Sequence, residues 1–178
     1  ATTEIYTLSL HDALPICVKA EVKNLLGEAS VMDTLAQDFV QIRLSSASTL
    51  QMKKLPMEQG DSVLCVVKTF AGPEKESELR LFTQDWKALD VSRLFDGKGI
   101  GELAGSLVQK PDTMSESRFE ELKAMIEPRM VSALLLQHEN AVVVRLSLPL
   151  LSTEDKKLVN AIKLQRKFNW NGKSFKES

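Results

Sequence analysis

SVLCVVKTF, residues 62–70, is almost continuously apolar and follows the turn signal Gly60-Asp61. A short apolar run of this kind favours a strand in the middle of a sheet. On either side of it, FVQIRL at 39–44 and ELRLFTQDW at 78–86 alternate between apolar and polar residues, which is typical of half-buried strands. These three stretches predict an antiparallel sheet with residues 62–70 near its centre.

The predicted sheet extends toward the start of the chain. CVKAEV at 17–22 also alternates, so it is a fourth candidate strand. Residues 28–37 are ambiguous and fit a short helix between strands, while AGPEKES at 71–77 is a polar connection. We therefore expect an α+β fold in which a small antiparallel sheet or partly closed barrel over about 17–86 forms a β-rich module.

The apolar residues that follow recur at a helical period, so we expect residues 87–178 to form a mainly helical region packed on the sheet. One helix should end near residue 109. The segment 115–137 is the clearest helical stretch, with Ser115 as a candidate N-cap. Because proline interrupts a helix, Pro128 should divide this segment into two helices or bend it.

One further strand is predicted near 140–150, where ENAVVVRLSLPLL is rich in valine. A helix should follow it through residue 168, with Ser152 as N-cap and acidic residues in its first turn. Asn171-Gly172 lies between short apolar flanks and predicts a C-terminal hairpin.

The first residues of the chain, ATTEIYTLSLHDALPI, differ in character from the rest. They match, codon by codon, the translation of a common short-read sequencing adapter, and the last base of that adapter fits the codon of Cys17. We therefore interpret residues 1–16 as non-native, exclude them from the fold prediction, and treat the chain as an N-terminally truncated fragment.

The composition argues against several classes of function. The chain of 178 residues has 23 basic and 24 acidic residues, a balance that does not favour a general polyanion-binding protein. No stretch is long and apolar enough to predict a membrane span. Cys17 and Cys65 are too few for a disulfide framework or a zinc site, and no local motif supports a nucleophile pair of Cys65 with His138. We expect no catalytic residues, no metal and no cofactor, and hence no enzyme.

One glycine-rich stretch, FDGKGIGELAG at 95–105, resembles the glycine box of the histidine-kinase and gyrase type of ATPase. In that alignment Phe95 occupies the position of the adenine-binding aspartate, so the carboxylate that should accept the adenine amino group is missing. The spacing of Gly97, Gly99 and Gly101 also differs from the phosphate loops of nucleotide-binding folds. We interpret the stretch as a loop that leads into a helix.

The strongest functional patch in the sequence is a basic set with aromatic neighbours near the C-terminus. It comprises Lys163, Arg166, Lys167, Trp170 and Lys173. Such residues can contact phosphates and stack on bases, so one hypothesis is a single-stranded nucleic-acid-binding domain of the oligonucleotide-binding-barrel type. A solvated helix face followed by a core-packing hairpin explains the same residues without a ligand.

The function we favour is a noncatalytic protein–protein interaction or assembly module of a larger protein or complex, with an unidentified protein partner. A third hypothesis comes from VKAEVKNLLGE, VQIRLSS and PMEQGDSVLCVVKTF, which resemble the amino-terminal β-module of flagellar hook-length control proteins. That resemblance implies an export-linked regulatory protein with no active site.

Overall fold

The computed structural model describes residues 20–25, 27–126, 130–148 and 151–178. Within these residues it is mostly antiparallel sheet with three short α-helices, so the fold class is α+β as predicted. The predicted non-native segment 1–16 and the predicted interruption at Pro128 lie outside the described residues.

The front half of the chain forms a seven-stranded sheet, here called the large sheet, in which each strand pairs antiparallel with the next along the chain. Its strands are β1 (Glu21–Lys23), β2 (Ala29–Leu35), β3 (Phe39–Ser45), β4 (Ser48–Pro56), β5 (Ser62–Ala71), β6 (Lys75–Phe82) and β7 (Ala88–Leu89). β5 lies in the interior between β4 and β6, as predicted for residues 62–70. Among the described residues no pairing joins β1 to β7, so the sheet is open rather than barrel-like.

The back half contributes a second antiparallel sheet, here called the small sheet, with the order β11-β10-β9-β8. Its strands are β8 (Met130–Leu135), β9 (Ala141–Ser147), β10 (Gln165–Trp170) and β11 (Phe175–Glu177). β9 confirms the strand predicted near 140–150, and β10 with β11 confirms the C-terminal hairpin. The expectation of a mainly helical region over 87–178 is wrong, because this sheet takes up much of it.

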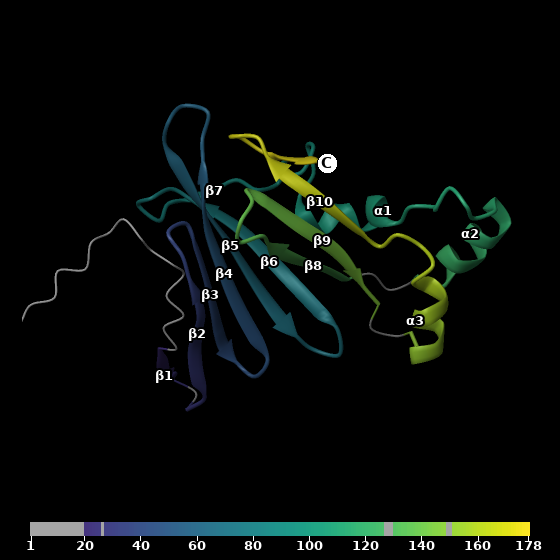
Figure 1. Ribbon diagram of the computed structural model, residues 1–178, viewed down its shortest axis with the longest axis horizontal. Coiled ribbons are helices and arrows are strands. Elements are labelled where there is room, and N and C mark those ends of the chain that lie inside the picture. Colours follow the sequence, from purple (N-terminus) through teal and green to yellow (C-terminus); the bar gives the residue numbers. More distant parts are fainter. Residues whose placement is uncertain (1–19, 26, 127–129, 149–150) are drawn as a thin grey trace, which may run out of the picture.

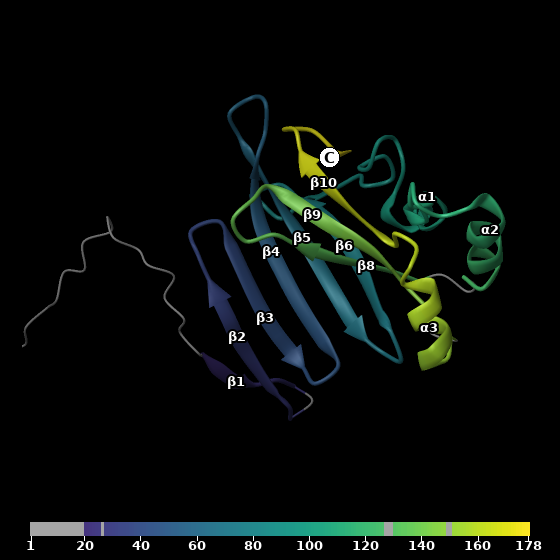
Figure 2. The same cartoon turned by 45° about the vertical axis from the view of Figure 1, so that its right-hand side comes forward.

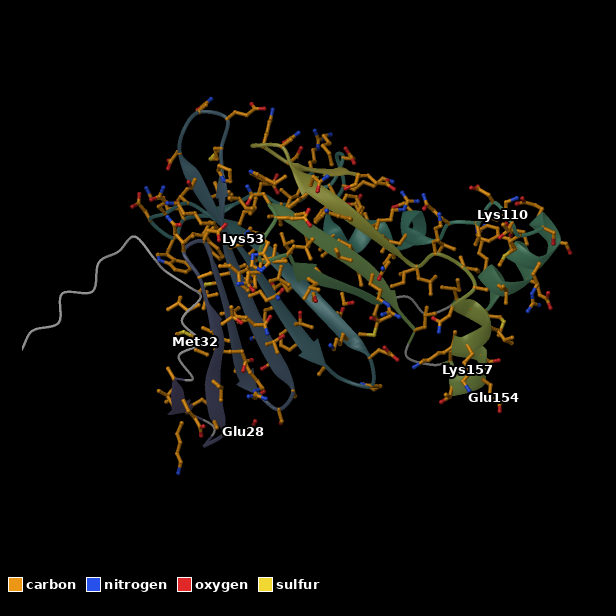
Figure 3. The ribbon with its side chains drawn as sticks, viewed as in Figure 1. Glu28, Met32, Lys53, Lys110, Glu154 and Lys157 are labelled. Atoms are coloured by element: carbon orange, nitrogen blue, oxygen red, sulfur yellow. The ribbon has the colours of Figure 1, made fainter. Side chains whose placement is uncertain are left out.

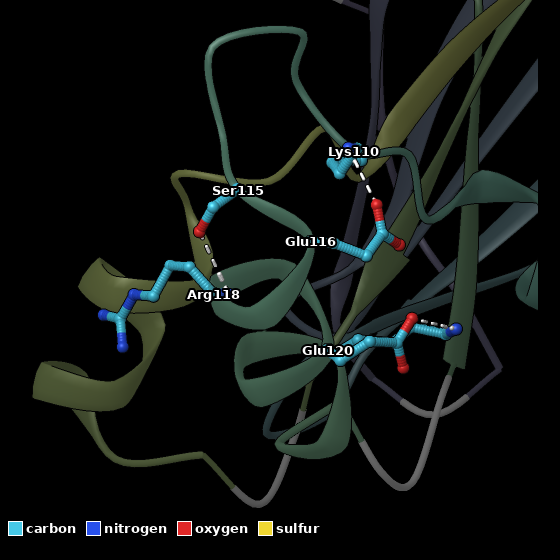
Figure 4. A network of polar contacts seen from close by, with 6 residues as sticks. Lys110, Ser115, Glu116, Arg118 and Glu120 are labelled. Carbon is cyan, nitrogen blue, oxygen red and sulfur yellow. Dashed lines mark hydrogen bonds and ion pairs between the residues drawn. The ribbon is translucent and has the colours of Figure 1, made fainter.

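The helical elements are short. They are the 3₁₀ helix η1 (Ile100–Leu103), α1 (Ala104–Leu107), α2 (Glu116–Ala124) and α3 (Thr153–Val159). Ser115 caps α2 by accepting a hydrogen bond from the Arg118 backbone N–H at 3.4 Å (Figure 4). Ser152 caps α3 in the same way, accepting from the Asp155 N–H at 3.1 Å. Both predicted N-caps are therefore confirmed.

One surface ion pair joins α2 to the preceding segment, and another lies within the helix. Lys110 contacts Glu116 in the first turn at 2.8 Å, and Lys123 contacts Glu120 at 3.0 Å (Figure 4). Both pairs are solvent-exposed, so each contributes at most about 1 kcal/mol. α2 and α3 lie together at one end of the molecule (Figures 1 and 2), and Lys156 of α3 is ion-paired with Glu74 in the turn between β5 and β6 of the large sheet.

The structure departs from the sequence-based prediction at four elements. Residues 130–135 form β8 rather than a helix, and the helix predicted to continue through 168 ends at Val159, with β10 beginning at Gln165. In the front half, the ambiguous segment 28–37 contains β2, and β4 was not predicted. Each of these strands pairs along its length with a neighbour, and this pairing outweighs the local preference of its residues.

The small sheet crosses one face of the large sheet, and the core fills the space on one side of this crossing (Figures 1 and 2). The buried side chains there come from β4, β5 and β6, from the small sheet and from the segment 91–107: Leu55, Val63, Cys65, Val67, Leu79, Leu81, Leu94, Leu103, Leu107, Ala133, Leu135, Val142, Val144 and Leu146. One contiguous apolar cluster thus joins the two sheets.

Phe95 fills the part of this core beneath the C-terminal hairpin. It is 0% exposed, stacks on Phe175 with ring centroids 5.3 Å apart, and meets Phe168 edge-on at 5.2 Å. Asp96 and Gly97 form the tight turn after it, with φ angles of 48° and 85°. Phe95 and Lys98 exchange backbone hydrogen bonds across this turn at 2.8 and 2.9 Å. The glycine-rich stretch therefore begins as a hairpin turn that anchors a core phenylalanine.

Candidate binding groove

The small sheet meets the large sheet along the edge of β8. In an antiparallel ladder alternate N–H groups of an edge strand have no strand partner. In β8, two of these N–H groups donate hydrogen bonds to side chains of the large sheet. The Ala133 N–H donates to Ser77 Oγ at 2.9 Å, and the Leu135 N–H donates to Gln51 Oε1 at 2.9 Å. The edge of β8 is thus satisfied by a polar row on the face beneath it.

Further contacts hold this polar row in place. Gln51 Nε2 donates to Gln41 Oε1 at 2.8 Å, and Ser77 Oγ lies 2.8 Å from Thr69 Oγ1. Gln51 and Ser77 are both buried, so losing either partner would leave a buried amide unsatisfied. The row fixes how the small sheet stands on the large one.

Lys53 extends the polar junction toward the turn between β8 and β9. Its side chain is 1% exposed, and Nζ donates at 2.9 Å both to Asp38 Oδ2 and to the Gln137 carbonyl. Figure 3 shows Lys53 where the large sheet lies against this turn. A buried ammonium group requires such partners, so Lys53 is a structural clamp rather than a free cation.

Since successive side chains of a strand point to opposite faces, the small sheet has two different sides. The even-numbered residues Val142 and Val144 face the core, whereas Val143 and Arg145 face the other way. On this second side Ser132 and Gln165 lie in register with Arg145, across β8, β9 and β10.

A groove lies between this second side and the uncovered part of the large sheet. Its wall is formed by Ser132, Leu134, Val143, Arg145 and Gln165, and its floor by Gln41, Thr49, Gln51, Thr69 and Lys75. The hollow has a volume of about 380 Å³. These residues come from seven strands, and the surface they form is called the groove below.

Arg145 lies where the groove joins two neighbouring hollows of about 460 and 390 Å³. Its side chain is exposed, and within the part of the chain that the structure describes its guanidinium has no ion pair or side-chain hydrogen bond. The same holds for Lys75, which lines two of the three hollows. The only acid lining any of them, among the described residues, is Glu74, which is ion-paired with Lys156. The groove is therefore cationic.

The structure does not gather the predicted basic set into one patch. Arg166 and Lys167 lie on opposite faces of β10, where Arg166 pairs with Glu177 at 2.5 Å and Lys167 pairs with Glu139. Trp170 donates from Nε1 to the Pro56 carbonyl at 2.6 Å and packs edge-on against Phe175.

The other two members of the set lie apart from each other. Lys173 lies in the hairpin turn, where its N–H donates to Asn171 Oδ1 at 3.0 Å. Lys163 lines the 390 Å³ hollow together with Arg145, so it is the one member of the predicted set that adjoins the groove. Arg145, Lys75 and the two glutamines were not among the site residues predicted from the sequence. The signal for Arg145 was present, since it is the one charged residue in a strand whose other residues are apolar except for Ser147.

Cys65 and His138 do not form a reactive pair. Cys65 is fully buried, and this burial raises the pKa of its thiol far above the ordinary value. His138 is exposed in the turn between β8 and β9. Among the described residues no cluster of three or more His, Cys, Asp and Glu side chains could hold a metal ion. Nor does any helix of that part of the chain have the length and apolarity needed to cross a bilayer.

Comparison with known proteins gives the family and the fold. Residues 7–175 match the family described as "Protein of unknown function (DUF3256)". The fold is similar to a solved structure described as a domain of an uncharacterized protein from Porphyromonas gingivalis W83, with a TM-score of 0.69 and 22% identity. The similarity covers 90% of this chain and 81% of that one. Among curated proteins, none matches.

Proposed function

The chain belongs to the DUF3256 family, and we propose that it is a noncatalytic interaction module that binds a protein partner in the groove. The observation that carries the proposal is the position of Arg145, an exposed cation at the junction of three hollows. Because its planar fork of N–H donors has no acceptor among the described side chains, it is available for a group from outside the chain.

The remaining groove residues support binding rather than chemistry. Its floor offers amides and hydroxyls, and its wall offers the half-exposed Leu134 beside the partly buried Val143. The one carboxylate nearby, Glu74, is engaged by Lys156. Histidine, aspartate and glutamate are the most frequent general acids and bases, and among the described residues that line the three hollows none of these is free. Arginine is enriched at protein–protein interfaces, and the amides and hydroxyls around Arg145 can supply the direct hydrogen bonds that such interfaces contain.

Site-specific photo-crosslinking tests this proposal. Leu134 on the groove wall and Leu158 on α3 are both leucines of similar exposure, 52% and 47%, and only Leu134 lines the groove. A photoreactive side chain at Leu134 should yield a discrete protein adduct in the cells that make the protein, and the same group at Leu158 should not. The adduct should disappear in the Arg145→Glu background. Equal labelling at both positions, or none at Leu134, would contradict the proposal.

The two alternative functions remain predictions. The nucleic-acid hypothesis relied on the C-terminal basic set, whose members Arg166 and Lys167 are paired with acids and whose Trp170 is packed against Phe175. Base stacking needs an open aromatic face, which Trp170 does not fully offer. The groove neither favours nor disfavours the flagellar hook-length-control hypothesis.

A further inference from the structure

We infer that the groove binds an extended acidic segment of the partner, an inference that rests on the proposed function. Arg145 is the main anchor for this segment and Lys75 is the second. Both cations line the groove, and among the described residues neither has an acidic partner. A carboxylate that enters the groove gains a forked contact with the guanidinium, which recognises the planar carboxylate better than an ammonium does.

The wall of the groove favours a ligand in extended conformation. Leu134 and Val143 form one cross-strand pair, and Ser132 and Arg145 form the next pair on the same face. These pairs are two residues apart along each strand, a spacing of roughly 7 Å. Side chains on one face of an extended peptide have the same spacing. An apolar residue and an acidic residue at positions i and i+2 of the ligand would therefore meet the apolar pair and Arg145 in turn.

The floor of the groove offers a further donor to such a segment. Gln41 uses its Oε1 to accept from Gln51, and Gln51 uses its own Oε1 to accept from the Leu135 N–H. The Nε2 group of Gln41 has no partner among the described residues, so it is free to donate to a backbone or carboxylate oxygen. Thr49 and Thr69 add hydroxyl groups beside it.

An acidic peptide fits the groove better than other polyanions do. Single-stranded nucleic acids bind largely by stacking their bases on aromatic side chains. Among the described residues that line the groove and the two adjoining hollows, none is aromatic. The groove thus offers charge and hydrogen bonds without a stacking platform.

Fluorescence anisotropy with synthetic probes tests the inference. The probes are a labelled eight-residue peptide that alternates Glu and Leu, the same peptide with Gln in place of Glu, and a dT octanucleotide. The Glu peptide should bind most tightly, and Arg145→Glu and Lys75→Glu should each weaken it about tenfold. Lys173→Glu makes the same charge change in the hairpin turn, outside the groove, and should leave the affinity unchanged. Circular dichroism checks that each variant is folded.

Four outcomes would overturn the inference. Equal affinity for the Glu and Gln peptides would remove the role of charge, and equal weakening by Arg145→Glu and Lys173→Glu would remove the role of the groove. Tighter binding of the oligonucleotide than of the Glu peptide would favour the nucleic-acid hypothesis. If crosslinking at Leu134 succeeds while the Glu peptide fails to bind, the proposed function stands and this inference falls. If crosslinking at Leu134 and binding of the Glu peptide both fail, the proposed function and this inference are both wrong.

Discussion

The two faces of the small sheet are built from residues that alternate along the same strands. On one face Val142 and Val144 are fully buried against the large sheet and the segment 91–107, while on the other Val143 and Arg145 line an open groove. The difference arises because the small sheet meets the large one along the β8 edge, which leaves one side filled and the other accessible. Stability and binding should therefore depend on different residues of one strand.

The largest expected effect comes from the filled side. Phe95→Ala removes a fully buried ring that contacts Phe168 and Phe175. It should lower the free energy of unfolding by about 3–5 kcal/mol, since the cavity cannot close completely. Urea denaturation measures this loss. Leu134→Ala, on the groove side, is the control and should cost less than about 1 kcal/mol. Similar losses for the two variants would contradict the distinction between the faces.

The polar row beneath β8 should give the next largest effect. Ser77→Ala leaves the Ala133 N–H without its acceptor, and this should cost about 1–3 kcal/mol. Amide hydrogen exchange at Ala133 should accelerate in the same variant. Thr49→Ala is the control, because this groove hydroxyl accepts no hydrogen bond from the backbone of β8. It should lower the free energy of unfolding by no more than about 0.5 kcal/mol. An unchanged exchange rate at Ala133 would show that the serine does not hold the strand.

A smaller, pH-dependent effect is expected at Asp96, next to Phe95. The hydrogen bond from Lys176, followed by that from the Glu177 N–H, lowers the pKa of Asp96 below its ordinary value. Because the pKa is lower in the folded state, the carboxylate stabilises the fold above the unfolded-state pKa of about 4, and this contribution is lost as the pH falls. The pair is half-exposed, so the contribution at pH 7 should be about 0.5 kcal/mol or less.

Asp96→Asn tests this dependence, since Asn also tolerates the positive φ of 48° at this position. The difference in unfolding free energy between the two proteins should be present at pH 7, and it should shrink as the pH falls below the unfolded-state pKa of about 4 and through the lower pKa of the folded state. If the difference in unfolding free energy stays constant from pH 7 to pH 2, the destabilisation comes from the backbone turn and not from the charge of Asp96.

The sequence predicted those elements whose local signals agree with their tertiary surroundings. In β3, β5 and β9 the pattern of apolar residues in the sequence fits a strand that packs against the core. Ser115 and Ser152 cap the helices that they were expected to cap. β4 was missed because Gln51 and Lys53 occupy inward positions, and only the structure shows the partners that make their burial tolerable. The pattern therefore looked too polar for a strand.

The remaining differences concern short apolar runs. The run that forms β8 is equally compatible with a helix segment, and only its pairing with β9 decides between them. The groove could not be predicted because it depends on a contact between distant parts of the chain. It forms where β8 lies over β4 and β6 and bonds to Gln51 and Ser77. Alternation indicated that Val144 and Arg145 face opposite ways, but not what lies opposite Arg145.

The central claim is that the Arg145 face of the small sheet binds a ligand and does not hold the fold together. The most direct test measures, on the single variant Arg145→Glu, both the free energy of unfolding and the affinity for the Glu-containing peptide. The account predicts a change in stability within about 0.5 kcal/mol, as for an exposed side chain, together with a loss of affinity of about tenfold. A fall in stability of more than about 2 kcal/mol, which would place Arg145 among the structural residues, or an unchanged affinity, would contradict it.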